Sequence, residues 1–123
     1  MKIGILEDDV AICGLLQEAL ARRGHVPYIY NNGEDFLKEI VTEEATPTPK
    51  PFDVVVIDLR LPAGISGVDA LQRVQMFFPD LPIVVISAVS AGNLAFIEEK
   101  FPGVKTFRKP FKLRDLVTAI ETT

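Results

Sequence analysis

The stretch FDVVVIDLRLPAGISG, from Phe52 to Gly67, decides the fold that we predict for this chain. Its consecutive apolar residues, Val54 to Ile57, are typical of a strand that is buried on both faces of a parallel sheet. Asp58 follows at the carboxyl end of that strand, ahead of a loop that contains proline and glycine. Because open α/β sheets bind ligands at the carboxyl ends of their strands, Asp58 is either a residue that caps the loop or a chemically active group.

Four further short apolar runs, at 2–6, 25–30, 83–86 and 104–107, predict strands that alternate with helices along the chain. Such alternation is typical of a parallel sheet that is covered by helices on both faces and joined by right-handed crossovers. Pro27 cannot donate a hydrogen bond to a neighbouring strand, so the second strand belongs at an edge of the sheet. We therefore predict a three-layer, flavodoxin-like (βα)5 fold with strand order 2-1-3-4-5.

Apolar residues at helical spacing predict five helices. The first helix ends before Gly24, and the second ends near Glu44, ahead of a proline-rich connection at 45–51. The third begins at a capping box formed by Ser66 and Asp69. The residues that we expect to face inward on the first, fourth and fifth helices are Ile12, Leu15, Leu16, Ala19, Leu20, Leu94, Ile97, Phe101, Leu113, Leu116, Val117 and Ile120.

The composition limits the class of protein. With 123 residues and 48% apolar content, the chain is expected to form a single domain, 1–123, around one core. A net charge of -4 and the lack of a basic run argue against direct binding of nucleic acid. The only cysteine, Cys13, cannot form an internal disulfide, and no apolar run is long enough for a membrane span or a signal peptide. We therefore expect a cytoplasmic protein without a membrane partner.

Polar side chains follow four of the predicted strands. Glu7 and Asp8 come after the first strand, Asp58 after the third, Ser87 after the fourth and Lys109 after the fifth. These residues are expected to converge, because parallel strands place their carboxyl ends at one edge of the sheet. Two like charges about 4 Å apart repel by about 4 kcal/mol at an effective dielectric constant near 20, so clustered carboxylates need cations. Lys109 is one candidate cation, and Mg²⁺, which prefers oxygen ligands, is the other.

An aspartate beside a metal ion, a lysine and a hydroxyl group is equipped to accept a phosphoryl group on its carboxylate. Lys109 and the metal would neutralise charge on the transferring oxygens, and the Ser87 hydroxyl could donate to one of them. Each residue taken alone also has a structural interpretation, as a cap or as a surface charge. We accept that interpretation for Asp9, as the cap of the first helix, but the convergence favours chemistry for Asp8 and Asp58.

Four segments, ILEDD, DVVVIDLRLP, IVVISA and FRKPF, closely resemble in order and spacing the receiver domain of bacterial two-component response regulators. The resemblance covers nearly all of the chain. It implies a signalling phosphoacceptor, not an enzyme, that takes a phosphoryl group from a phosphohistidine on a sensor histidine kinase or a histidine phosphotransfer protein. It also implies a downstream output domain or protein, and it allows a homodimer that forms on phosphorylation.

The resemblance further implies how the residues around the acceptor act. Asp58 would be the phosphoacceptor and a metal ligand, and Asp8 would be a direct ligand of Mg²⁺. Glu7 would assist through a water molecule, and Arg60 would offer its backbone carbonyl to the metal. The site is thus expected to be built from the ends of the first and third strands.

The segment before the last helix combines family features with a departure. Ser87 and Lys109 are implied to contact the phosphoryl group, with a cis peptide bond between Lys109 and Pro110. Thr106 stands three residues before Lys109, where the family usually has an aromatic switch residue. Phe107 follows one place later, on the opposite face of the strand. The usual aromatic side chain of the switch is therefore absent from its position.

Three other features distinguish this chain from the family pattern or bear on its partners. The loop LPAGISG is one residue longer than the common form, and GVKTF lacks an acidic pair that often precedes the fifth strand. The missing pair weakens an assignment to the subfamily that dimerises through that face. Phe96 lies off the inward stripe of the fourth helix, and we weigh a partner contact against ordinary burial for it.

Two other classes of function remain open from the residues. A phosphatase that hydrolyses small phosphate monoesters through an aspartyl-phosphate would start at the same kind of aspartate, but it usually needs a second aspartate and a cap domain, and here position 60 is Arg60. A flavin-type binding module of the same topology would need a phosphate-cradling loop after the first strand, where EDDV instead places negative charge. The residues also leave open whether this is a stand-alone regulator or one part of a larger protein.

Overall fold

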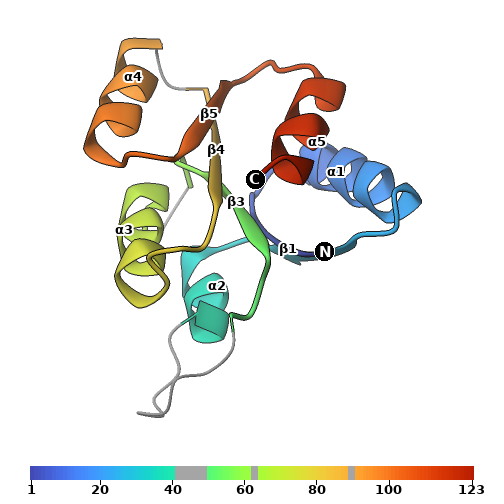
Figure 1. The fold of residues 1–123 in the computed structure, drawn as a ribbon, viewed down its shortest axis with the longest axis horizontal. Coiled ribbons are helices and arrows are strands. Elements are labelled where there is room, and N and C mark those ends of the chain that lie inside the picture. Colours follow the sequence, from blue (N-terminus) through green and yellow to red (C-terminus); the bar gives the residue numbers. More distant parts are fainter. Residues whose placement is uncertain (41–49, 62–63, 89–90) are drawn as a thin grey trace.

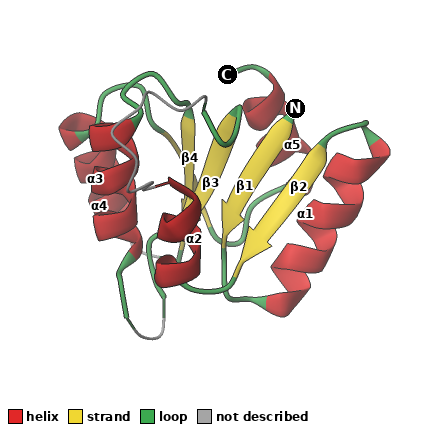
Figure 2. Ribbon diagram, turned by 90° about the horizontal axis from the view of Figure 1, so that it is seen from below, coloured by secondary structure: helices red, strands yellow, loops and turns green. Residues whose placement is uncertain are grey.

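The computed structural model describes residues 1–40, 50–61, 64–88 and 91–123. A five-stranded sheet in the order β2-β1-β3-β4-β5 forms its centre, and all neighbouring strands are parallel. The strands are β1 (Lys2–Leu6), β2 (Val26–Tyr30), β3 (Val54–Asp58), β4 (Ile83–Ser87) and β5 (Lys105–Arg108). Figure 2 shows β2, β1, β3 and β4 side by side with their arrowheads toward one edge. The predicted strand order, with Pro27 on an edge strand, is confirmed.

Helices cover both faces of the sheet, as the alternating pattern predicts. They are α1 (Val10–Arg22), α2 (Gly33–Ile40), α3 (Gly67–Phe77), α4 (Ala91–Lys100) and α5 (Leu113–Glu121). In Figure 1, α1 and α5 lie on one side of the sheet, and α2, α3 and α4 lie on the other. None of the helices in the described part of the chain is long and apolar enough to cross a membrane.

Two hydrophobic clusters, one on each face, enclose the sheet. In β3, Val54 and Val56 pack toward α1 and α5, whereas Val55 and Ile57 pack toward α2, α3 and α4, and all of them have 0% exposure. This double burial explains the uninterrupted apolar run, because each such side chain contributes about 1.5–3 kcal/mol when it leaves water. The clusters hold β3 rigidly, and Asp58 at its end is held with it.

The buried stripe of α1 differs from the prediction at one position. Leu15 was expected to face inward, but its side chain is 55% exposed, while Cys13, Leu16 and Leu20 are buried. Neighbouring residues of a helix point about 100° apart, so with Leu16 centred on the sheet Leu15 is turned away from it. Cys13, a small residue, packs close to the end of β1, where its Sγ donates to the Glu7 carbonyl oxygen at 3.4 Å.

Most of the remaining predicted boundaries agree with the structure within about one residue. Gly24 follows α1 with a φ of 84°, a conformation that favours glycine, and β5 begins at Lys105 instead of Val104. Ser66 caps α3 by accepting a hydrogen bond from the Asp69 backbone N–H at 3.1 Å. The predicted helix end near Glu44 and most of the proline-rich connection lie outside the described residues.

Candidate functional site

Three carboxylates meet at the edge of the sheet where the strands end. Glu7 and Asp8 directly follow β1, and Asp58 is the last residue of β3, the neighbouring strand. One carboxylate oxygen from each lies within 4.8 Å of the others. Glu7 and Asp58 are almost completely buried, at 0% and 2% exposure, whereas Asp8 is exposed. The structure thus brings together the acidic residues that the sequence placed on two separate strands.

Lys109 joins two of these carboxylates. Its Nζ donates to Glu7 Oε1 at 2.6 Å and to Asp58 Oδ2 at 3.1 Å, and both contacts are ion pairs. Burial alone would lower the pKa of Lys109, but hydrogen bonds to Glu7 and Asp58 outweigh it and raise this pKa above its ordinary value. The lysine therefore stays charged and acts as a fixed cation between the two buried acids.

Glu7 is the carboxyl group of the cluster whose ionised form is disfavoured by its surroundings. Burial, followed by the neighbouring Asp58 carboxyl group, raises the pKa of Glu7 from 4.5 to about 8, although Lys109 opposes the shift. Its second carboxylate oxygen, Oε2, is buried and has no hydrogen-bond partner among the described residues. An unpartnered buried oxygen beside two other carboxylates is a suitable place for a cation, because one ion would satisfy the oxygen and reduce the repulsion.

The Asp58 side chain is held from two sides. Asp58 Oδ1 accepts a hydrogen bond from the Arg60 backbone N–H at 3.0 Å, and Oδ2 accepts one from Lys109 Nζ. Behind it, Gly67 at the start of α3 packs so closely that a Cβ there would collide with the Asp58 carbonyl oxygen and with Leu59 Cα. The orientation of the carboxylate is therefore fixed by backbone on one side and by a charge on the other.

Ser87 and Lys109 reach the same edge from β4 and β5. Ser87 ends β4 with 0% exposure, and its carbonyl oxygen accepts a hydrogen bond from the Lys109 backbone N–H at 2.8 Å. The peptide bond between Lys109 and Pro110 is cis, as predicted. Asp9, which follows the acidic pair, caps α1 by accepting from the backbone N–H groups of Ala11 and Ile12, so its structural interpretation is confirmed.

The predicted switch residues lie outside this cluster. Thr106 Oγ1 donates a hydrogen bond to Glu98 on α4, whereas Phe107 packs against the hydrophobic cluster under α1 and α5. The prediction that these two side chains occupy opposite faces of β5 is confirmed. Phe96 on α4 is 59% exposed, so ordinary burial is excluded for it.

Sequence reasoning missed one contact near the site. Glu34, in the first turn of α2, accepts a hydrogen bond from the backbone N–H of Ile65 in the loop that follows β3. The two residues are 31 positions apart, and no spacing pattern links them. The only hint in the sequence is the unusual length of the loop itself.

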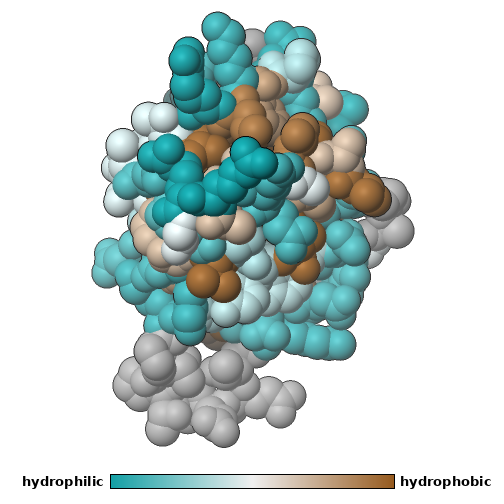
Figure 3. Space-filling view, turned by 90° about the vertical axis from the view of Figure 1, so that its right-hand side faces the viewer, coloured by the Kyte–Doolittle hydropathy of each residue, from teal (hydrophilic) through white to brown (hydrophobic). Residues whose placement is uncertain are grey.

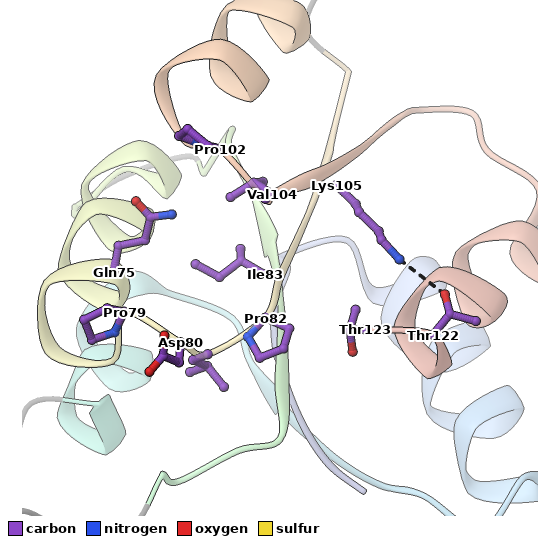
Figure 4. A pocket seen from close by; sticks show the side chains of 12 residues that line it. Gln75, Pro79, Asp80, Pro82, Ile83, Pro102, Val104, Lys105, Thr122 and Thr123 are labelled. Atoms are coloured by element: carbon purple, nitrogen blue, oxygen red, sulfur yellow. Dashed lines mark hydrogen bonds between the residues drawn. The ribbon is translucent and has the colours of Figure 1, made fainter.

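A pocket at the opposite edge of the sheet contains none of the predicted site residues. It has a volume of about 320 Å³ and lies at the amino ends of β4 and β5, between Pro82, Pro102 and the last residues of the chain. Figure 4 shows Lys105 reaching across it to donate to Thr122 Oγ1 at 3.2 Å. This pocket therefore lies apart from the residues that we predict to carry the chemistry.

The comparison with known families agrees with this geometry. The sequence profile of the response regulator receiver domain matches residues 3–121. The chain belongs to this family. A receiver domain is the phosphoacceptor module of two-component signal transduction, and nothing in the comparisons supports the alternative of a small-molecule phosphatase.

Individual relatives cover nearly all of this receiver domain. It is 31% identical to sporulation initiation phosphotransferase F of Bacillus subtilis over 122 residues, which are 98% of this chain and 90% of that protein. It is 28% identical to the DNA-binding transcriptional regulator NtrC of Escherichia coli K12 over 97% of this chain, but it spans only 24% of NtrC. The BeF₃-activated receiver domain of DrrB, from Thermotoga maritima, superposes with a TM-score of 0.80 at 25% identity, covering 98% of this chain and 94% of that one.

Proposed function

We propose that Asp58 is the residue of this receiver domain that becomes phosphorylated. Its site is formed with Glu7, Asp8, Ser87 and Lys109 within a single domain, 1–123. The observation that carries the proposal is the meeting of three carboxylates within 4.8 Å beside the half-buried Lys109. Only Asp58 among the three combines burial with hydrogen bonds to both carboxylate oxygens. It is therefore the carboxylate whose direction is fixed for attack.

The residues present fit a divalent metal ion, and we propose Mg²⁺. The donor set is all oxygen, and the buried Glu7 Oε2 still needs a partner. Asp8 and Asp58 would hold the ion directly, Glu7 through water, and Arg60 through its backbone carbonyl. When bound, the ion supplies positive charge next to the transferring phosphoryl oxygens.

The transfer needs only one nucleophile and fixed positive charge. An oxygen of the Asp58 carboxylate forms a bond to the phosphorus of a phosphohistidine, and the phosphorus–nitrogen bond of that histidine breaks. The histidine nitrogen keeps the electron pair and takes a proton from water. Lys109, already 3.1 Å from Asp58, neutralises charge on the phosphoryl oxygens, and the Ser87 hydroxyl donates to one of them.

The phosphoryl donor is proposed to be a sensor histidine kinase or a histidine phosphotransfer protein in the cytoplasm. Its histidine has to approach Asp58 along a surface beside the site, and a groove of about 400 Å³ opens there, lined by Lys109, Leu15 and Leu113 among others. Figure 3 shows hydrophobic side chains, in brown, on the face that α1 and α5 form. The exposed position of Leu15, unexpected for a core residue, fits a contact with such a partner.

Phosphorylation is proposed to change the face formed by α4, β5 and α5, where an output domain or protein would bind. The added charge beside Lys109 and Ser87 would bias a two-state equilibrium in this face. Thr106, which donates a hydrogen bond to Glu98, and the exposed Phe96 are its proposed contact residues, and Phe107 is partly buried on the opposite face of β5. A homodimer formed through this face on phosphorylation is one form that this output could take.

Mass spectrometry after incubation with phosphoramidate and Mg²⁺ tests the acceptor. Phosphoramidate is a suitable donor because it contains the same phosphorus–nitrogen bond as phosphohistidine. We expect wild type to gain the mass of one phosphoryl group and Asp58→Asn to gain none. Asp53→Asn, at the exposed amino end of the same strand, is the matched control and should label like wild type. Equal labelling of Asp58→Asn, or no labelling of folded wild type, would refute the proposal.

A further inference from the structure

The loop after β3 is fastened to the start of α2 by a charged side chain. Glu34 Oε1 accepts a hydrogen bond from the Ile65 backbone N–H at 2.9 Å. Gly64, the preceding residue, has a φ of 75°, and a Cβ there would collide with the Glu34 carboxylate. The loop thus adopts a conformation that favours glycine at the point where the carboxylate approaches it.

A second contact joins the same two segments. A Cβ on Gly33, the first residue of α2, would lie 2.9 Å from both Cβ and the carbonyl oxygen of Ile65. The Ile65 side chain also packs against the hydrophobic cluster under α2, α3 and α4. The start of α2 and residues 64–65 are therefore in close contact through packing and through the hydrogen bond from the Ile65 backbone N–H to the Glu34 side chain.

The residues that follow Ile65 lie next to Asp58. Ser66 caps α3, and Gly67 packs on the Asp58 carbonyl oxygen without room for a Cβ. On the other end of the loop, the Arg60 backbone N–H donates to Asp58 Oδ1. Both ends of the loop thus touch Asp58, and the contact with α2 fixes the described part between them.

We propose that Glu34 is a positioning residue for phosphoryl transfer, which acts by holding Ile65 and, through Ser66 and Gly67, the backbone that packs against Asp58. The inference rests on the proposed role of Asp58. Loss of the hydrogen bond would leave Gly67, and the Asp58 backbone against which it packs, less well fixed, so phosphorylation would slow down. In transfer reactions, small displacements of positioned groups lower rates strongly.

The test compares Glu34→Ala with Glu34→Gln in the full chain, with phosphoramidate and Mg²⁺ as the probe. Glutamine keeps an oxygen that can accept from Ile65 but loses the charge that favours the first turn of a helix. We expect Glu34→Ala to label about fivefold more slowly, a factor that corresponds to about 1 kcal/mol, and Glu34→Gln to label like wild type. Glu39→Ala, which changes an exposed glutamate of the same helix, is the control and should not change the rate.

Hydrogen exchange of the Ile65 amide gives a second readout that does not depend on phosphorylation. It should become faster in Glu34→Ala and stay slow in Glu34→Gln. If both variants label equally slowly, the charge on α2 and not the hydrogen bond matters, and the inference is wrong. It is also wrong if Glu34→Ala labels at the wild-type rate or leaves the Ile65 exchange unchanged. Absence of labelling in wild type would instead refute the acceptor role of Asp58, and the exchange result would still decide the anchoring contact.

Discussion

The two ends of the sheet carry charged clusters that are built in opposite ways. At the carboxyl edge, Lys109 pairs with Glu7 and Asp58, whose side chains are 0% and 2% exposed. At the amino edge, Glu121 at the end of α5 accepts from Arg23 at 2.9 Å and contacts His25 at 2.9 Å, and its side chain is 24% exposed. The two carboxylates that pair with Lys109 are thus shielded from water, whereas the Glu121 carboxylate remains in contact with it.

This difference separates a site from a surface contact. Burying an ion pair has an unfavourable desolvation free energy, which the attraction between the two charges often offsets only in part. Exposed ion pairs lose little hydration and contribute little to stability. The cluster at the carboxyl edge also has more acidic than basic groups, since it contains three carboxyl groups and Lys109, which pairs with two of them. A protein that only needed stability would gain nothing from this arrangement, so the excess charge points to a bound cation and to chemistry.

The largest effect is expected when the buried cluster loses its cation. Lys109→Ala leaves the buried Asp58 carboxylate beside Glu7 without a positive charge, and we expect a loss of about 3 kcal/mol of unfolding free energy at pH 7, measured by urea denaturation in the presence of a chelator. The value lies at the low end for buried pairs because the Lys109 side chain keeps 19% exposure. Labelling of Asp58 should be abolished as well.

The control for this prediction is an ion pair of the same type at the surface. Lys38 and Asp35 on α2 are 3.7 Å apart, and their side chains are 78% and 60% exposed. Lys38→Ala should change the unfolding free energy by less than about 0.5 kcal/mol. Equal stability of the two lysine variants would show that removing Lys109 leaves no unfavourable buried charge, and the prediction would be wrong.

The main features of the fold and of the buried cluster could be predicted from the sequence because topology determines them. Once Pro27 places β2 at an edge, the order of the strands follows, and Asp8 and Asp58 must lie on neighbouring strand ends. Lys109 could be added because its strand ends at the same edge. Nothing beyond apolar runs, helical spacing and the polarity of strand ends is needed for these conclusions.

Contacts between loops and helices could not be predicted in this way. The hydrogen bond from Ile65 to Glu34 depends on the positive φ of Gly64, and the exposure of Leu15 depends on how α1 is rotated on the sheet. The bond between Thr106 and Glu98 likewise depends on where α4 lies against β5. These features result from packing between separate elements, for which periodicity carries no information.

A second effect, of opposite sign at the two edges, is expected in the dependence of stability on pH. Glu7 has a pKa raised from 4.5 to about 8, so the folded metal-free protein binds this proton more tightly than the unfolded chain. The resulting stabilisation is complete below about pH 4.5 and is lost as the pH rises toward 8. Urea denaturation in a chelator should show this fall for wild type, and Glu7→Gln should flatten it. An unchanged slope in Glu7→Gln would show that Glu7 is not responsible.

The smallest effect is expected at the amino edge, where the sign is reversed. Hydrogen bonds from Arg23 and then His25 lower the pKa of Glu121 below 4.5, so its stabilising contribution is present above that value and is lost as the pH falls through the lower pKa of the folded state. Glu121→Gln should therefore be slightly less stable than wild type at pH 6, and the difference should shrink toward pH 3. Thermal unfolding of both proteins across this range measures it. Because Arg23 and Glu121 are in contact with water, with side chains 57% and 24% exposed, added salt should weaken the difference, whereas the pH dependence caused by the buried Glu7 should respond to salt much less.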